Sequence, residues 1–237
     1  MENETHHDHQ QALVSCICIT YNRPEQLLKA ILNFKDQSYL HKELIISYPK
    51  EDKPTKDLIR KASALYFLKI ITVERDKEVS VGTAKNMAIS MAKGEYICIW
   101  DDDDYHAPNR LHHQMHVLQT TGTSYQASIL LRITLYDHLT QRANLSLPYH
   151  WSGTLLCRRS FLLQHPFENT NFLEDINLIR FLESENLLFH IEYAFMLYIY
   201  VYHGRNALDY HHFSYFMRNS FKFTDKYNKT VQQTLND

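Results

Sequence analysis

The chain has 237 residues, of which 44% are hydrophobic and 22% charged, and its formal net charge is −2 with neutral histidines. This length and composition are typical of a globular protein with a sizeable core. The charge balance provides no global basic field, so we do not expect nucleic acid as a partner.

The first residues, 1–11, are polar and rich in histidine, and we expect them to form a disordered leader. His6, His7 and His9 could hold a metal ion by chance, but we assign them no function. No apolar run reaches the roughly 20 residues that span a bilayer, and no signal peptide is visible. We therefore expect a cytoplasmic protein, with the inner face of the membrane as an alternative location.

The four cysteines predict buried free thiols in a reducing compartment, because three of them lie in expected core strands. Cys16 and Cys18 lie two apart in one apolar run, so they share one face of a strand and cannot pair with each other. Together with Cys98 and Cys157 they have none of the ligand spacings of a zinc site.

Between residues 12 and 100 apolar strands alternate with amphipathic helices. Strands are expected at 12–20, 42–48, 69–73 and 95–100, and helices at 23–37, 53–66 and 81–94. We expect Ser80 or Thr83 to cap the third helix and Gly94 to end it. This alternation predicts an α/β fold with a parallel, right-handed sheet.

The second half has a mixed pattern. We expect strands and turns at 124–137 and 143–162, a helix at 172–186, and one or two strands at 187–203. The tail from Asn206 mixes aromatic with basic residues and is expected to be helical as far as about Phe223. No internal repeat or linker is visible, so we expect one α/β domain with a mixed second half.

Four aspartates, Asp101 to Asp104, follow the expected strand at 95–100 directly. Ligands of parallel sheets bind at the carboxyl ends of the strands. Clustered carboxylates are stable there when Mg²⁺ or Mn²⁺ neutralises them, and Mg²⁺ commonly binds carboxylates together with substrate phosphates. The alternative is a solvated acidic turn. The position between a buried strand and a helix start at 108–111 favours the metal.

A resemblance to a known family is carried by three segments in order: "VSCICITYNRPEQLLKAI", "VSVGTAKNMAISMAKGEYICIWDDDDYHAPNRL" and "FLEDINLIRFL". They resemble the family 2 glycosyltransferases of the GT-A fold, which are inverting nucleotide-sugar transferases. The resemblance implies a Rossmann-like, mostly parallel central sheet flanked by helices, with a mixed acceptor-side second half. The implied domain covers 12–205, with a nucleotide-sugar half at 12–105 and an acceptor half at 106–205, followed by a C-terminal helical tail at 206–237.

The resemblance also implies a donor site with Mn²⁺ or Mg²⁺ as cofactor. Asp101 and Asp103 match the family's Asp-x-Asp metal motif, which implies Asp103 as the direct metal ligand and Asp101 as a further one, with Asp101 or Asp102 also near the donor ribose. His203 matches a late histidine at the metal or diphosphate. The other residues implied to contact the donor are Thr20, Tyr21, Asn22, Gly82, Lys85 and Asn86.

One segment departs from the family pattern. Many members carry an acidic pair after the second strand that binds the nucleotide base, and here Tyr48 and Pro49 take its place. Glu51 or Asp52 is expected to take over this role, or Tyr48 to stack on the base. The base identity is therefore open: a UDP-sugar is the default, with GDP- and dTDP-sugars as alternatives.

The catalytic base implied by the resemblance is Asp175, with Glu174 beside it; the alternative is that both are acids favoured by a helix dipole. A metal that stabilises the leaving group and one carboxylate that deprotonates the acceptor suffice for direct displacement. On the acceptor side, Trp151 is expected to stack on a sugar or to be buried. Gly153 and Thr154 are expected to form the acceptor loop.

The sequence therefore predicts a metal-dependent, inverting glycosyltransferase with a glycan or lipid-linked acceptor, in surface polysaccharide or glycan biosynthesis. A sugar-nucleotidyltransferase is the enzymatic alternative, but no glycine-rich phosphate loop follows the first strand. A degenerate, non-catalytic nucleotide-sugar-binding protein is the other. For the aromatic and basic tail, contact with a membrane surface and packing on the domain or on a second subunit, as in a homodimer, remain open.

Overall fold

A computed structural model describes residues 11–121 and 124–236, so most of the expected leader lies outside the described residues. Within them, seven strands form a sheet in the order β10-β6-β9-β4-β1-β2-β3. The strands are β1 (Val14–Ile19), β2 (Lys42–Pro49), β3 (Ile70–Arg75), β4 (Tyr96–Ile99), β6 (Ala127–Leu130), β9 (Leu156–Arg158) and β10 (Leu188–Ile191). Strands β1 to β4 are mutually parallel as expected, and β9 is antiparallel to both of its neighbours.

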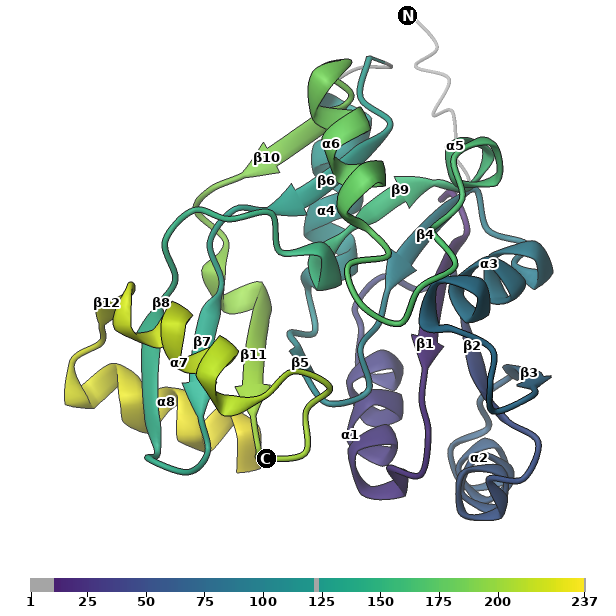
Figure 1. The fold of residues 1–237 in the computed structure, drawn as a ribbon, viewed down its shortest axis with the longest axis horizontal. Coiled ribbons are helices and arrows are strands. Elements are labelled where there is room, and N and C mark those ends of the chain that lie inside the picture. The colour runs from purple at the N-terminus through teal and green to yellow at the C-terminus, as the bar shows by residue number, and fades with distance from the viewer. Residues whose placement is uncertain (1–10, 122–123, 237) are drawn as a thin grey trace, which may run out of the picture.

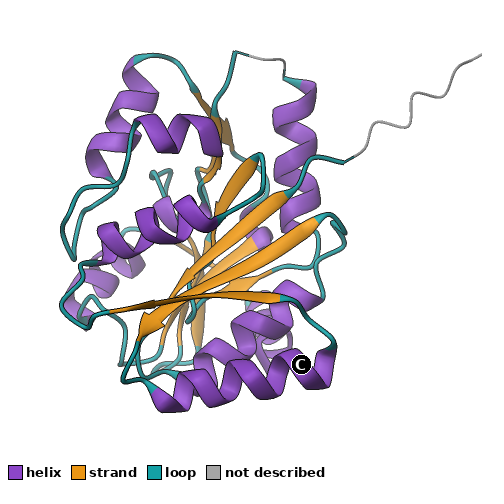
Figure 2. Cartoon of the chain, turned by 90° about the vertical axis from the view of Figure 1, so that its right-hand side faces the viewer, coloured by secondary structure: helices purple, strands orange, loops and turns teal. Residues whose placement is uncertain are grey.

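Helices cover both faces of this sheet (Figure 2). One face packs against α1 (Pro24–Lys35), α2 (Lys53–Tyr66) and α4 (Arg110–Thr120), and the other against α3 (Val81–Met91), α5 (Arg159–Gln164) and α6 (Ile176–Ser184). In β1, Cys16 and Cys18 pack in the first layer and Ile17 in the second, as the two-residue period of a strand requires. The continuously apolar strands are therefore explained by burial on both faces.

A second, five-stranded sheet of the described chain has the order β12-β8-β7-β11-β5 and lies beside the first (Figure 1). Its strands are β5 (Tyr105–His106), β7 (Thr134–Asp137), β8 (Arg142–Leu145), β11 (Tyr198–Tyr202) and β12 (Phe221–Lys222). The short 3₁₀ helices η1 (Ser152–Thr154) and η2 (Phe195–Leu197) precede β9 and β11.

The tail, expected to be helical as far as about Phe223, forms α7 (Tyr210–Arg218), then β12, then α8 (Asp225–Asn236). Phe213 of α7 packs in one core cluster of the second sheet and Val231 of α8 in another, and both side chains are fully buried. The tail thus supplies an edge strand and two covering helices to the second sheet.

Two local expectations need comment. Ser80 caps α3 as one of the two expected residues, since its hydroxyl accepts a hydrogen bond from the Thr83 backbone N–H at 3.2 Å. Gly94 does not end that helix, which stops at Met91. A Cβ at Gly94 would lie 2.7 Å from the Ser15 backbone nitrogen, so the glycine instead permits close approach to β1.

The four cysteines are free and buried, as the sequence predicts. Among the described helices, none combines the length and the apolar character needed to cross a membrane. Strand β1 is flanked by β2 on one side and β4 on the other. The chain therefore reverses its direction of sheet growth next to β1, and this is where α/β sheets open a crevice for ligands.

Candidate active site

A cleft of about 620 Å³ lies at this crevice and is lined by residues of both sheets. Of the residues that the sequence singles out, its lining includes Thr20, Tyr21, Lys85, Asp101, Asp102, Asp103, Trp151, Gly153, Glu174 and Asp175. Asn22, Tyr48, Asp52, Gly82, Asn86, Thr154 and His203 are not part of the lining.

Asp102 joins the ends of β1 and β4. Its carboxylate accepts a hydrogen bond from the Thr20 hydroxyl at 2.6 Å and one from the Arg23 guanidinium at 3.3 Å. Burial, and then the neighbouring charge of Asp103, raise the pKa of Asp102 to about 7. This carboxylate is therefore costly to ionise in the protein alone, although a hydroxyl and a cation already contact it.

Three donors converge on one oxygen of Asp103. Arg23 Nη1 lies 2.9 Å, His203 Nε2 3.3 Å and Asn206 Nδ2 3.4 Å from Asp103 Oδ2. His203 was predicted near this aspartate from the sequence, whereas Arg23 and Asn206 were not. Arg23 stands in the "TYNR" segment after β1, and this proximity to the first strand end was the available signal.

Asp101 and Asp104 share the hydroxyl of Tyr198. That hydroxyl lies 2.9 Å from Asp101 Oδ2 and also contacts Asp104, whose other oxygen accepts from the Val201 N–H at 2.8 Å. Burial and the charges of Asp103 and Asp101 raise the pKa of Asp104 well above its usual value. A protonated Asp104 can donate to Tyr198 while Tyr198 donates to Asp101, so the fourth aspartate has a structural role.

A buried cation lies beneath the aspartates. Arg110 is fully buried, and its guanidinium donates to the carbonyls of Ile99 at 3.2 Å and Gly153 at 3.1 Å. It also contacts His106. Burial, and then the charge of Arg110, lower the pKa of His106 well below its usual value, which favours the neutral imidazole. The fixed positive charge of Arg110 partly offsets the aspartates from the protein side, and the sequence had not indicated it.

Helix α3 clamps the segment 167–175, which leads to the expected catalytic pair. Asn86 bonds the Phe167 backbone through both ends of its amide, at 2.8 and 3.0 Å. A Cβ at Gly82 would lie 1.8 Å from the Glu168 carbonyl oxygen, so only glycine fits there. Both residues were expected to contact the donor, and in the structure both hold this segment against α3.

Lys85 and Glu174 form a buried ion pair with an Nζ–Oε1 distance of 2.6 Å. Burial disfavours the charged lysine, but the carboxylates of Glu174, Asp101 and Asp175 outweigh it and raise the pKa of Lys85. Asp175 is the N-cap residue of α6, yet its side chain makes no cap hydrogen bond. Of the pair, Asp175 therefore presents a carboxylate to the cleft that neither a cap nor Lys85 occupies.

Two residues considered for base recognition are used elsewhere. Tyr48 is 2% exposed, and its hydroxyl donates to Glu74 at 3.1 Å, so it cannot stack on a base from this position. Asp52 caps α2 by accepting from Thr55 and also accepts from the Asn22 N–H at 2.6 Å. Its carboxylate therefore holds the loop after β1 in place, and Asn22 contributes its backbone there.

Arg75, at the end of β3, lines the cleft and was missed in the sequence. It is 7% exposed, its Nη2 donates to the Thr20 carbonyl at 3.3 Å, and its buried Nε has no hydrogen-bond partner within 11–121 and 124–236. Burial lowers the pKa of this guanidinium. An unpaired buried donor on a cation at this edge suits an anionic ligand.

The residues expected on the acceptor side also differ in whether they line the cleft: Trp151 and Gly153 do, and Thr154 does not. Trp151 is 8% exposed and lines the cleft, and its buried Nε1 has no hydrogen-bond partner in the described part of the chain. A Cβ at Gly153 would lie 2.3 Å from Asp101 Oδ2, so this glycine lets η1 approach the aspartates. Thr154 is fully buried and its hydroxyl donates to the Trp151 carbonyl at 2.7 Å, so it positions the loop and does not face an acceptor.

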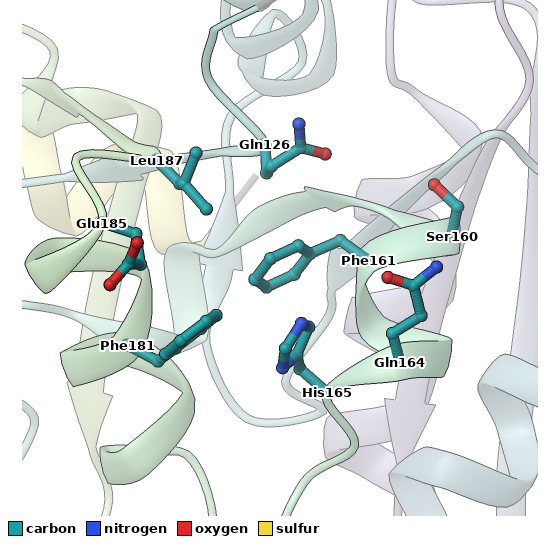
Figure 3. A pocket seen from close by; sticks show the side chains of 8 residues that line it. All are labelled: Gln126, Ser160, Phe161, Gln164, His165, Phe181, Glu185 and Leu187. Carbon is teal, nitrogen blue, oxygen red and sulfur yellow. The ribbon is translucent and has the colours of Figure 1, made fainter.

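A second cavity, of about 310 Å³, lies between α5 and α6 and shares no lining residue with the cleft. The rings of Phe161, His165 and Phe181 lie together on its wall (Figure 3), and the His165 ring centroid is 4.4 Å from that of Phe161 and 4.6 Å from that of Phe181. Its polar lining has one carboxylate, Glu185, and no lysine or arginine. This cavity lacks the convergent charges of the cleft.

The architecture places the protein in the GT-A class of folds. Staphylococcus aureus TarS in complex with UDP superposes with a TM-score of 0.65 at 15% identity, covering 80% of this chain and 60% of that one. The mannosyltransferase PcManGT from Pyrobaculum calidifontis, in complex with GDP-Man and Mn²⁺, gives 0.65 at 15% identity, covering 84% and 59%.

The model of glycosyl transferase family 2 matches residues 15–172, more than half of the chain, and the chain belongs to this family. One relative is the Escherichia coli UDP-Glc:alpha-D-GlcNAc-diphosphoundecaprenol beta-1,3-glucosyltransferase, 30% identical over 116 residues. That match covers 49% of this chain and 45% of the enzyme. The chain thus spans less than two thirds of these relatives.

Proposed function

We propose that the protein transfers a sugar from a nucleoside diphosphate sugar to an acceptor hydroxyl, with inversion at the sugar carbon and with a divalent metal ion. One observation carries the proposal. The aspartate cluster at the end of β4 and Asp175 line one cleft, and among the described residues the Asp175 carboxylate forms neither a helix-cap hydrogen bond nor an ion pair. Membership of glycosyl transferase family 2 supports the same activity.

The residues present fit Mn²⁺ or Mg²⁺. Asp103 Oδ2 and His203 Nε2 lie 3.3 Å apart, a separation that suits two ligands of one ion. Asp101 was expected as a further ligand, but its carboxylate accepts a hydrogen bond from Tyr198. In the described chain, Asp101, Asp103 and His203 do not form a group whose ligand atoms all lie within 4.8 Å of one another. Asp103 and His203 would hold the ion. The bound ion would supply charge stabilisation to the leaving diphosphate.

The chain's own residues would perform the remaining tasks. Asp175 would accept the proton of the acceptor hydroxyl as it attacks, while Glu174 stays paired with Lys85. Arg23 and Arg75 line the cleft and would bind the diphosphate as fixed cations. Transfer by direct displacement needs one such base, whereas glycoside hydrolysis uses two paired carboxylates.

A UDP-sugar is our proposed donor. Support comes from the E. coli relative, whose name specifies UDP-Glc, and from TarS, which was solved with UDP. The mannosyltransferase solved with GDP-Man keeps a GDP-sugar as the alternative. With Tyr48 buried, Tyr21 is the candidate for base stacking, since it lines the cleft and is 46% exposed.

A glycan or lipid-linked acceptor fits the other end of the cleft. Trp151 packs with Tyr149 and Phe216, and the three aromatic residues line the cleft together. Aromatic faces with a polar edge suit sugar rings. Peripheral membrane contact through the tail remains part of the proposal, supported by the exposed Tyr215, Phe221 and Tyr227.

Thermal unfolding with UDP, GDP, dTDP and CDP, each with and without Mn²⁺, tests donor binding. We expect one nucleotide to stabilise the protein only with Mn²⁺, by about 2.7 kcal/mol at a hundredfold excess over Kd. Asp103→Ala should abolish this stabilisation. Asp57→Ala, at an exposed surface pair, is the matched control and should retain it.

Asp175→Asn separates binding from chemistry. It should bind the nucleotide with Mn²⁺ as the wild type does, yet lose about 10²-fold or more of donor turnover. Undiminished turnover would remove Asp175 from the mechanism. Absence of stabilisation by every nucleotide in the wild type would contradict donor binding, and with it the proposed transfer.

A further inference from the structure

Three side chains from distant parts of the chain meet in a group that contains none of the four aspartates. His150 precedes η1, Glu183 lies in the last turn of α6, and His190 is in β10. His150 Nε2 lies 3.0 Å from Glu183 Oε1, and His190 Nε2 contacts the same oxygen. The two imidazole rings are stacked, with centroids 5.4 Å apart.

We propose that His150, Glu183 and His190 form a binding site for Zn²⁺. Two imidazole nitrogens and one carboxylate oxygen are a donor set of three-ligand zinc sites, whose bonds of about 2.0–2.2 Å put the ligand atoms about 3.4 Å apart. The three ligand atoms here lie within 4.8 Å of one another. Small side-chain rotations therefore suffice to receive the ion.

The exposure of the three side chains supports an accessible site. They are 42%, 33% and 34% exposed for His150, Glu183 and His190 respectively. Water can thus reach the site and supply a fourth ligand, and two of the three ligands, Glu183 in α6 and His190 in β10, stand on regular secondary structure. Two imidazole donors also favour Zn²⁺ over Mg²⁺.

Hydrogen bonding alone is the competing explanation, because two imidazole N–H groups can donate to one carboxylate. In that case both Nε2 atoms carry protons, whereas zinc binding requires both to be free of protons. Zinc binding that depends on these histidines is therefore expected of a metal site and not of a hydrogen-bonded cluster alone, and a direct binding measurement separates the two explanations.

The location gives the ion a structural consequence. His150 is adjacent to Trp151 and lines the cleft, and α6 begins next to Asp175. Zinc would therefore tie the loop that carries Trp151 to the far end of the helix that starts at the proposed base. The binding itself does not depend on the proposed transferase activity.

Zinc binding is measured on the full chain with His6, His7 and His9 replaced by alanine, after removal of metals with a chelator. We expect one equivalent of Zn²⁺ by calorimetry, and a tetrahedral Co²⁺ absorption band in place of zinc. His150→Ala, Glu183→Gln and His190→Ala should each weaken binding about tenfold or more.

Two controls separate this site from others. Asp103→Ala should still bind one equivalent of Zn²⁺, which distinguishes the proposed zinc site from the aspartate cluster. His112→Ala/His116→Ala removes an exposed histidine pair on α4 and should also leave binding intact. Where His190→Ala fails to fold, His150→Ala decides, because it lies outside regular secondary structure. Unchanged binding in His150→Ala, or no binding by the parent chain, would overturn the proposal.

Discussion

Four identical residues in a row have different surroundings. Asp104 is bonded to Tyr198 and Val201, and Asp102 to Thr20 and Arg23. Asp103 faces Arg23, His203 and Asn206. The charge repulsion that the sequence raises is met by buried donors and by protonation as well as by the proposed metal ion.

Asp102→Asn should stabilise the metal-free protein. The pKa of Asp102 is about 7 in the folded chain and 3.8 ordinarily, so the folded state binds more protons between these values. Stability therefore falls as pH rises from about 4 to about 7 and then levels off. Asparagine removes this contribution, and we expect the free energy of unfolding at pH 8 to rise by about 1–3 kcal/mol.

Urea unfolding of both proteins at pH 5 and pH 8, in chelator, measures the difference. The asparagine can donate to the Thr20 hydroxyl and accept from Arg23, so the local contacts persist. A gain that is equal at both pH values would contradict the expected titration. Asp57→Asn, at an exposed site, should change neither value.

At the scale of elements, α3 is a docking surface for the segment that leads to Asp175. Ser80 and Thr83 donate to the Asn169 side chain at 2.7 and 2.8 Å, and Asn86 holds Phe167. The polar residues of this helix therefore serve chain–chain contacts. Lys85 is the member of this face that also lines the cleft.

Lys85→Met should destabilise the fold strongly. It leaves Glu174, 7% exposed, without its cation, and breaking a buried pair costs about 3–5 kcal/mol. The double variant Lys85→Met/Glu174→Gln should regain more than half of that loss, because no charge is left buried. Denaturant unfolding of the three proteins gives both numbers.

Lys56→Met is the matched control, since Lys56 and Glu74 form a pair at 2.8 Å whose side chains are 58% and 36% exposed. It should cost less than about 1 kcal/mol. Similar losses in Lys85→Met and Lys56→Met would show that the buried pair contributes nothing special.

At the scale of the whole molecule, two sheets meet at the cleft, and the C-terminal tail completes the second. Strand β12 pairs with β8, and α8 buries Val231 against Tyr136, Ala143 and Ile199. The tail is therefore part of the fold that presents Tyr198 and Asn206 to the aspartates.

Val231→Asp should open the second sheet, because a carboxylate without a partner replaces a fully buried side chain. Hydrogen exchange should then accelerate in β8 and α8 while β1 and β2 stay protected. Thr230→Asp adds the same charge at an exposed neighbouring position and should leave exchange unchanged. Uniform acceleration across both sheets would show that the two unfold as one unit.

The first half of the fold was predictable because its signals are local. The strands at β1 to β4 are apolar runs, and α2 was expected at 53–66, which is where it lies. The second half was less so: β9 has three residues and β12 has two, too short for any periodicity. Their pairing depends on partners far away in the chain.

By itself the sequence determined the alternation of strands and helices, the aspartates after β4, and the candidate Asp175, because each depends on residues adjacent in the chain. Only the tertiary structure decided which residues share the cleft. Tyr48, Asp52, Gly82, Asn86 and Thr154 lie outside its lining, whereas Arg23, Arg75, Tyr198 and Asn206 are part of it, and the buried Arg110 lies beneath the aspartates. These contacts span up to 103 positions, as between Asp103 and Asn206, so no local pattern encodes them.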